Sequence, residues 1–299
     1  MATLREIRRR ITGVKNTQKI TKAMKMVAAA KLRRAQEAII STRPYARKLG
    51  ELLRHLVTEI DPKLNPLLTP RELQRVALVV VTSDRGLCGA FNSNIIKTSV
   101  NHIKEQYQQY YEMDHGLRLV TIGKKGFDHF NKRDYELYSK HVGIYQNLGF
   151  NHARGIVDEL TEGYLAGEFD RVVVVYNEFK SVIQQRIVVE QLLPIPPEET
   201  KPAGDLKSLA HIEYIYEPSS AELINTLIPR HLNFQMWRIL LESNAAEQGA
   251  RMAAMDNATE NARELIRDLT LSFNKARQAA ITKELLEIVS GAEALKKAG

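Results

Sequence analysis

The sequence contains one cysteine, Cys88, among its 299 residues. A single cysteine excludes an intrachain disulfide, a CxxC redox motif and a zinc site built on cysteines. It also favours a reducing, cytoplasmic setting. The eight histidines are scattered, with no HExxH motif and no pair spaced four residues apart, so the sequence offers no metal site.

Long apolar runs are missing as well. No segment approaches the roughly 20 apolar residues that span a bilayer. Arg8, Arg9 and Arg10 are not followed by the apolar stretch of a secretory signal. Apolar residues make up 44% of the chain and charged residues 26%, which are the proportions of a folded globular protein.

Acidic residues are absent from two stretches near opposite ends of the chain. Ten Lys or Arg residues and no acid lie between Arg8 and Arg34. A second acid-free stretch, from Asp268 to Glu284, carries further lysine and arginine. A short charge run is often a solvated helix face, but antiparallel pairing would place these two side by side. With the net charge of +8, they predict an acidic partner such as nucleic acid, anionic lipid or a negatively charged protein.

Both ends of the chain carry a hydrophobic repeat. Apolar residues recur at alternating steps of three and four from Leu4 to Ile60, where thirteen of seventeen positions are apolar, and again from Met252 to Ala280. This spacing is the seam of a coiled coil. A helix of 60 residues would be about 90 Å long, whereas the mean helix of a globular domain has about 11 residues. We therefore expect both helices to reach beyond a compact core.

Local signals set the limits of these helices. Thr3 and Glu6 predict a capping box at the first helix. Pro44 predicts a kink or a local weakness, because proline removes one helical hydrogen bond. Ser219 or Ser220 is expected to begin the second helix. After Ala280 its apolar positions slip by one residue, which predicts that the C-terminal end runs on without its partner.

Strand and helix patterns alternate in the middle of the chain. Strands are predicted at 75–81, 117–122, 135–142, 171–176 and 185–192, and helices at 92–110, 124–131 and 151–165. The last two strands are expected to pair antiparallel. Such alternation is typical of a doubly wound α/β domain. The predicted organisation is a helix over 1–60, an α/β domain over 73–215 and a second helix over 219–298.

The segment from Thr82 to Asn92 follows a predicted strand and opens a helix, as nucleotide-binding loops do. It matches neither GxxxxGK[ST] nor GxGxxG, so we interpret it as a tight strand-to-helix turn. Cys88 lies near Arg85 and a helix start, a setting that lowers the pKa of a thiol. A buried structural cysteine is the preferred interpretation over a nucleophile.

Four segments carry a resemblance to a known family. They are NTQKITKAMKMVAAAK at 16–31, SDRGLCG at 83–89, EQGARM at 247–252 and ITKELLEIVSGAEA at 281–294. Together, and in this order, they resemble the gamma subunit of F-type ATP synthases. Gly249 replaces a usual serine or alanine. The resemblance extends over the whole chain.

The resemblance implies a long antiparallel coiled coil of the N- and C-terminal helices plus a Rossmann-like doubly wound α/β domain. It implies a central-stalk rotor that couples ion flow through the membrane c ring to ATP synthesis, by turning inside the alpha/beta hexamer and setting the conformations of the beta subunits. Such a subunit is non-catalytic and has no cofactor. Its partners are the alpha, beta and epsilon subunits and the c ring, without nucleic acid. Its membrane association is indirect, at the cytoplasmic face of the inner membrane.

The resemblance also assigns contact residues. Those matching beta-subunit contacts are Met24, Lys25, Lys31, Arg33, Arg34, Arg277, Gln278 and Thr282. Those matching the region that meets the c ring or the epsilon subunit are Tyr214, Tyr216, Glu217 and Arg85. The family's chloroplast branch has an inserted segment with two cysteines that acts as a redox switch. This sequence has a single cysteine and no such insertion, so we do not expect thiol regulation of that kind. With no transit peptide ahead of the first motif, we expect a bacterial type.

Two other functions are compatible with parts of the sequence. A nucleic-acid-binding coiled coil with a basic arm fits the composition, although few aromatic residues interleave the basic ones. A dinucleotide-binding enzyme fits the α/β pattern but lacks the fingerprint loop.

Overall fold

The computed structural model describes residues 3–59, 65–181, 184–196 and 220–298. The chain divides into two compact units. One joins Met1–Val27 to Met252–Gly299, and the other is Ala28–Arg251. The threefold division into 1–60, 73–215 and 219–298 stays a prediction.

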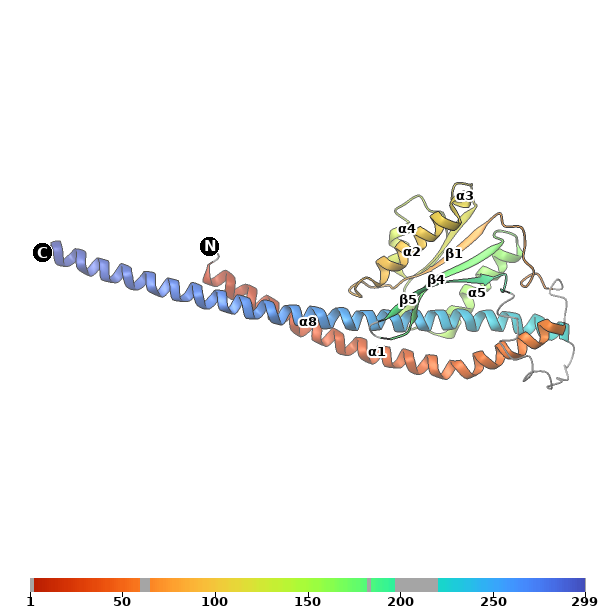
Figure 1. Ribbon diagram of the computed structural model, residues 1–299, viewed down its shortest axis with the longest axis horizontal. Helices are drawn as coiled ribbons and strands as arrows, with labels where there is room; N and C mark the ends of the chain where they lie inside the picture. The colour runs from red at the N-terminus through yellow and green to blue at the C-terminus, as the bar shows by residue number, and fades with distance from the viewer. Residues whose placement is uncertain (1–2, 60–64, 182–183, 197–219, 299) are drawn as a thin grey trace. The chain divides into compact units, whose positions relative to one another are not determined.

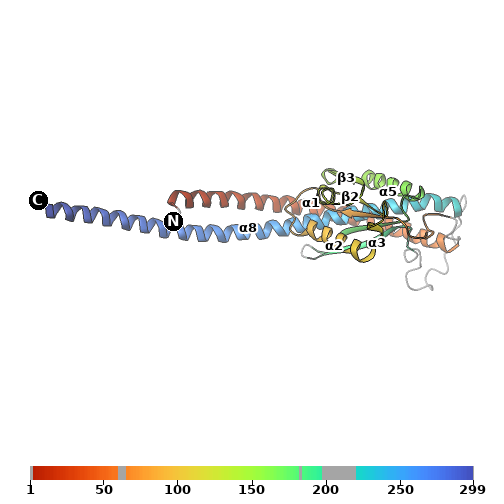
Figure 2. The same cartoon turned by 90° about the horizontal axis from the view of Figure 1, so that it is seen from above.

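The first unit is an antiparallel pair of helices. It contains the start of α1 (Leu4–Glu59) and the end of α8 (Ser220–Ala298), which run side by side in Figures 1 and 2. The hydroxyl groups of Thr21 and Thr259 lie 2.7 Å apart, and the guanidinium of Arg8 lies 5.9 Å from the ring centre of Phe273. Residues later in α1 contact residues earlier in α8, which establishes that the two helices are antiparallel.

The predicted seam is the buried face of both helices. Each position of the N-terminal repeat from Leu4 to Leu56 is buried or half-buried, and so is each position from Met252 to Ala280. Beyond Ala280 the side chains are exposed as far as Ala292. The prediction that this end of α8 runs on without α1 is therefore confirmed.

The predicted capping box is present at the start of α1. The backbone N–H of Thr3 donates to the Glu6 carboxylate at 2.9 Å, and the N–H of Glu6 donates to the Thr3 hydroxyl at 3.3 Å. These bonds satisfy two donors that a helix start leaves free. The helix continues through Pro44, whose side chain is exposed. Helix α8 begins at Ser220, as predicted.

The second unit contains a five-stranded sheet with the order β3-β2-β1-β4-β5 (Figure 1). The strands are β1 (Val76–Val81), β2 (Leu117–Ile122), β3 (Leu137–His141), β4 (Arg171–Phe179) and β5 (Gln185–Leu193). The first four are parallel, and β5 pairs antiparallel with β4, as predicted. The order changes direction between β1 and β4, which is the arrangement of a Rossmann-like doubly wound domain.

Helices cover both faces of the sheet. They are α2 (Phe91–Gln106), α3 (Gln108–Tyr111), α4 (Lys124–Phe130), the 3-10 helix η2 (Ile144–Gln146) and α5 (Phe150–Leu165). The single helix predicted at 92–110 is wrong, because the chain breaks at Tyr107, where φ is −129°. This break lets the Tyr107 ring enter the core, where it is 6% exposed, and burial of an aromatic ring outweighs one interrupted helical turn.

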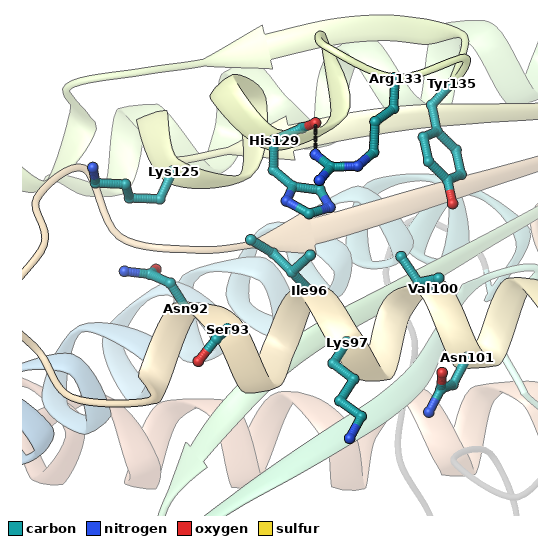
Figure 3. A pocket seen from close by; sticks show the side chains of 10 residues that line it. All are labelled: Asn92, Ser93, Ile96, Lys97, Val100, Asn101, Lys125, His129, Arg133 and Tyr135. Atoms are coloured by element: carbon teal, nitrogen blue, oxygen red, sulfur yellow. Dashed lines mark hydrogen bonds between the residues drawn. The ribbon is translucent and has the colours of Figure 1, made fainter.

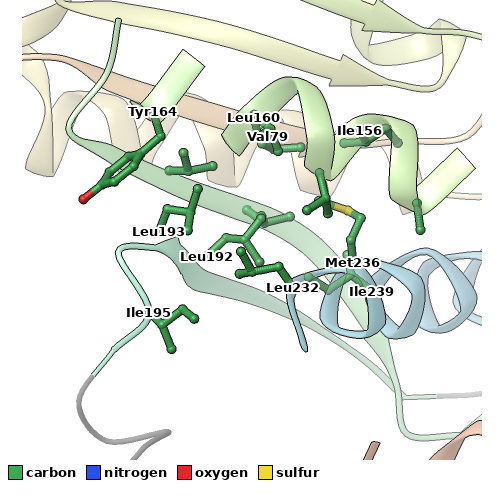
Figure 4. Close-up of a cluster of buried hydrophobic side chains, with 14 of the residues drawn as sticks. Val79, Ile156, Leu160, Tyr164, Leu192, Leu193, Ile195, Leu232, Met236 and Ile239 are labelled. Atoms are coloured by element: carbon green, nitrogen blue, oxygen red, sulfur yellow. The ribbon is translucent and has the colours of Figure 1, made fainter. Parts of the chain in front are cut away.

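The pleat of the sheet divides the core in two. Alternate residues of β1, including Val79, pack with α5, α8 and the end of α1, as Figure 4 shows for Leu160 and Met236. The intervening residues, including Leu78, pack with α2 and with Phe130 of α4. Because β1 is buried on both faces, its apolar run is continuous rather than alternating.

A half-buried ion pair joins α8 to β5, the far strand of the sheet. The guanidinium of Arg238 donates to the Glu190 carboxylate at 2.6 Å and to the Tyr176 hydroxyl at 3.0 Å. The Tyr176 hydroxyl in turn donates to the other oxygen of Glu190 at 2.9 Å. Glu190 raises the pKa of Arg238 despite the opposing effect of burial, so the guanidinium stays charged. These bonds fix the register of α8 on β5, which apolar packing alone defines less sharply.

Two leucines of α5 test the energetic importance of this core. Leu160 is 1% exposed and Leu165 is 50% exposed. We expect Leu160→Ala to lower the free energy of unfolding by about 2–5 kcal/mol, because it leaves a cavity. We expect the matched control Leu165→Ala to change it by less than about 0.5 kcal/mol. The fluorescence of Trp237, the single tryptophan and a neighbour of this core, would follow urea unfolding. Equal losses in both variants would contradict the assignment.

Candidate interaction surfaces

The edge of the sheet where Rossmann-like domains bind nucleotides is closed by internal hydrogen bonds. One oxygen of Asp84 accepts the backbone N–H groups of Lys124, at 3.0 Å, and of Gly143, at 2.9 Å. The Thr82 hydroxyl accepts the N–H of Gly126 at 2.8 Å. Backbone N–H groups at a helix start are what a phosphate would bind. Here a carboxylate and a hydroxyl of the chain itself bind them.

The loop between β1 and α2 is a compact turn. The Asn92 amide donates to the Ser83 hydroxyl at 2.8 Å and to the sulfur of Cys88 at 3.2 Å. Leu87 and Gly89 both adopt left-handed backbone conformations, with φ of 64° and 58°. Leu87 is not a residue that favours this region, and the loop's own hydrogen bonds hold it there. The interpretation as a tight strand-to-helix turn is supported.

Cys88 is a structural residue. Its side chain is 1% exposed, and burial raises the pKa of its thiol. The lowered pKa considered from the sequence is therefore wrong, because desolvation outweighs the attraction of nearby positive charge. A reactive cysteine needs an accessible thiolate, which this position does not provide.

Arg251 of α8 forms a buried ion pair within its own helix and hydrogen bonds to this loop. The Arg251 guanidinium donates to the Glu247 carboxylate at 2.7 Å and to the backbone oxygens of Arg85 and Gly86 at 3.3 and 3.1 Å. Two of the segments that carry the family resemblance thus contact each other. Glu247 is 5% exposed, and burial raises its pKa to about 7 although Arg251 opposes the shift. The sequence did not indicate the contact between Arg251 and the oxygens of Arg85 and Gly86, because these residues are far apart in the chain.

The raised pKa of Glu247 predicts a pH dependence of stability. Its ordinary value is 4.5, so between pH 4.5 and 7 the unfolded chain releases this proton before the folded protein does. Stability is therefore lost as the pH rises through this window. Relative to Glu247→Gln, we expect the wild type to lose about 2 kcal/mol of unfolding free energy between pH 5 and pH 8. Urea unfolding at each pH measures this, and a constant difference would refute the assignment.

Five of the predicted contact residues lie in the first unit. Met24 is half-buried, and the Lys25 ammonium contacts the Asp256 carboxylate at 2.6 Å. This pair is partly exposed and stabilises the unit by less than about 1 kcal/mol. Arg277, Gln278 and Thr282 are exposed on α8. They are therefore accessible to a partner, whereas Met24 is accessible only in part.

The remaining predicted contact residues belong to the second unit or lie outside the described part of the chain. Lys31, Arg33 and Arg34 are exposed on α1, where Arg33 pairs with Glu37 one turn on, at 2.9 Å. The Arg85 side chain is exposed, while its backbone oxygen accepts from Arg251. The predicted foot residues lie outside the described residues; they are Tyr214, Tyr216 and Glu217.

Two further observations concern the described residues alone. No group of three or more metal-binding side chains lies together within them. None of their helices combines the length and the apolar character that crossing a membrane requires.

The fold defines a class of stalk proteins, in which the two ends of the chain pair as a coiled coil and the middle forms a Rossmann-like domain. The sequence matches the family described as ATP synthase over residues 3–295. The chain belongs to this family, among the gamma chains of F-type ATP synthases, and it is a rotor subunit of the central stalk.

Two relatives, each named ATP synthase gamma chain, are similar to this chain over almost its full length. The ATP synthase gamma chain of Chlorobaculum tepidum is 58% identical over 298 residues, covering 99% of this chain and 100% of that protein. The gamma chain of Chlorobaculum parvum is 55% identical with the same coverage.

Solved structures agree with the fold. A chain from the central stalk and c ring of Tetrahymena thermophila mitochondrial ATP synthase is 27% identical, with a TM-score of 0.58, covering 80% of this chain and 99% of that one. A chain from the Euglena gracilis mitochondrial ATP synthase is 21% identical, with a TM-score of 0.67, covering 98% of this chain and 94% of that one. At this identity the likeness supports the fold alone.

Proposed function

We propose that this chain transmits torque between the c ring and the alpha/beta hexamer without catalysing ATP chemistry itself. The proposal rests on the exposed apolar side chains near the end of α8. From Ile281 to Ala292 the described side chains are exposed, and Leu285 and Ile288 are 57% and 68% exposed. A row of exposed apolar residues on one helix requires a partner. A ring of surrounding subunits in which the helix turns provides one.

The contacts that set the beta-subunit conformations are proposed to be electrostatic. Arg277 is exposed in a stretch without acidic residues, and Gln278 and Thr282 share its part of α8. Charge-assisted hydrogen bonds are directional and stronger than neutral ones, so they suit contacts formed only at defined rotor angles. On α1 the residues proposed to contact beta subunits are Met24, Lys25, Lys31, Arg33 and Arg34.

The sheet domain is proposed to receive the torque. The ion pair of Glu190 with Arg238 and the hydrogen bonds from Arg251 to the backbone oxygens of Arg85 and Gly86 hold α8 at two places. Helix α8 continues as one helix to Ala298. Rotation of the domain is therefore passed along the helix backbone itself. Arg85, Tyr214, Tyr216 and Glu217 are proposed to contact the epsilon subunit or the c ring. Membrane association is then indirect, at the cytoplasmic face of the inner membrane.

A disulfide cross-link tests the rotor function in the assembled complex. We expect Ala280→Cys, oxidised to a cysteine placed in the facing beta loop, to abolish net ATP synthesis in membrane vesicles, because a fixed shaft cannot turn. Reduction of the cross-link should restore the rate and serves as the control. Undiminished synthesis in the cross-linked complex would refute the proposal.

Two arginines of α8 test the proposed torque contact. We expect Arg277→Gln to lower the rate of ATP synthesis about tenfold or more, because one charge-assisted contact contributes about 1.5–3 kcal/mol. The matched control is Arg267→Gln, which removes another exposed arginine of the same helix and should leave the rate within about twofold. Vesicle ATP synthesis at equal complex content measures both. Equal effects would indicate a general charge effect rather than a contact at Arg277.

A further inference from the structure

A solvent-open cleft lies on the sheet domain between α2 and the segment that contains α4 and the residues after it (Figure 3). Its volume is about 510 Å³. Sites for small molecules typically have about 300–1,000 Å³. None of the described residues assigned above to subunit contacts lines it.

One wall of the cleft is apolar and rigid. Ile96 and Val100 lie one helical turn apart on α2 and are half-buried. The Tyr135 ring faces them (Figure 3). Its position is fixed by the Phe130 and Tyr111 rings, whose centres lie 5.1 and 5.2 Å away. These three side chains form a surface against which a flat or apolar group would pack.

The other wall is basic. Lys125, His129 and Arg133 come from α4 and the turn after it, and none of the ten lining residues is acidic. Within the described residues, neither Lys125 nor Arg133 forms an ion pair with a carboxylate. One nitrogen of Arg133 donates to the backbone oxygen of His129 at 2.8 Å, which holds the guanidinium beside the histidine ring (Figure 3). Its remaining N–H groups are left for another acceptor.

The Arg133 guanidinium and the His129 ring lie side by side at one end of the cleft (Figure 3). Burial and the charge of Arg133 both lower the pKa of His129. Arg133 also acts on the Tyr135 hydroxyl, whose pKa it lowers against the larger opposing effect of burial. The guanidinium thus lies within electrostatic range of both rings, at the junction of the basic and the apolar walls. An anion at this junction would relieve the repulsion between Arg133 and a protonated His129.

We propose that this cleft binds a small organic anion. Its carboxylate or phosphate would be held by Arg133, Lys125 and His129, and its flat or apolar body would pack on Ile96, Val100 and Tyr135. Both parts are required, because an open basic surface by itself binds ions weakly in water. The apolar wall selects ligands that present an apolar group next to the charge.

The test uses phenyl phosphate as a probe for the full-length chain. Methyl NMR of protein labelled at isoleucine and valine would follow Ile96 and Val100. We expect saturable shifts of these two methyl signals with a dissociation constant on the order of 1–10 mM, the range for a ligand of this size. Inorganic phosphate and benzyl alcohol, which each carry half of the chemistry, should bind at least about tenfold more weakly. No shift at Ile96 and Val100 up to about 50 mM phenyl phosphate would overturn the proposal.

Neighbouring residues provide matched controls. We expect Arg133→Gln to weaken phenyl phosphate binding at least about fivefold, through loss of charge-assisted bonds, while Lys132→Gln leaves it unchanged. If Arg133→Gln perturbs the fold, Lys125→Gln with Lys124→Gln as its control makes the same comparison. Equal weakening by a variant and its control would show that only the net charge of the protein matters. Equal affinities for inorganic phosphate and phenyl phosphate would show that the apolar wall does not contribute to binding. Either outcome would overturn the proposal.

Discussion

Burial of one face of α8 is the interaction on which the rest of the structure depends. Its 79 residues form a single helix whose buried face changes partners along its length. Near its start, Ile228 and Met236 complete the core under the sheet. Nearer its end, Met255 and Ala262 form the seam with α1. One covalent element therefore belongs to both compact units.

Two arginines, one buried and one half-buried, secure this helix where it meets the sheet domain. Arg238 and Arg251 each form several hydrogen bonds, and each lies in a setting where removal of its partner would leave an uncompensated charge. Apolar packing is tolerant of small sliding movements, whereas a bidentate or forked guanidinium contact is not. The rotor needs a fixed angular relation between α8 and the domain that holds it, and such contacts provide it.

The domain has the strand order of nucleotide-binding domains, but its own side chains bind the backbone donors at that edge of the sheet. The strand order still changes direction between β1 and β4, and a helix still follows β1 and β2. Asp84 nonetheless places a carboxylate where an anion would otherwise bind, which repels phosphate and satisfies the backbone donors internally. A concave surface lies on the face covered by α2 and α4.

The sequence by itself determined the features that depend on local periodicity. Residues such as Leu32 and Ile39 were predicted on the buried face because helix geometry fixes which positions coincide, and the capping box at Thr3 and Glu6 needs only four consecutive residues. The strands followed from short β-branched runs. The four motifs indicated the family, and with it the rotor function.

Tertiary structure decided the rest, because it depends on residues that are distant in the chain. Tyr107 ends α2 only because a pocket for its ring exists in the folded core. The pKa of Glu247 and that of Cys88 are set by desolvation, which no local pattern reports. The hydrogen bonds from Arg251 to the Arg85 loop, and the placing of Arg133 across a cleft from Ile96, arise from packing of separate elements. Sequence periodicity therefore fixed which faces are buried, and long-range packing determined what those faces, once assembled, can bind.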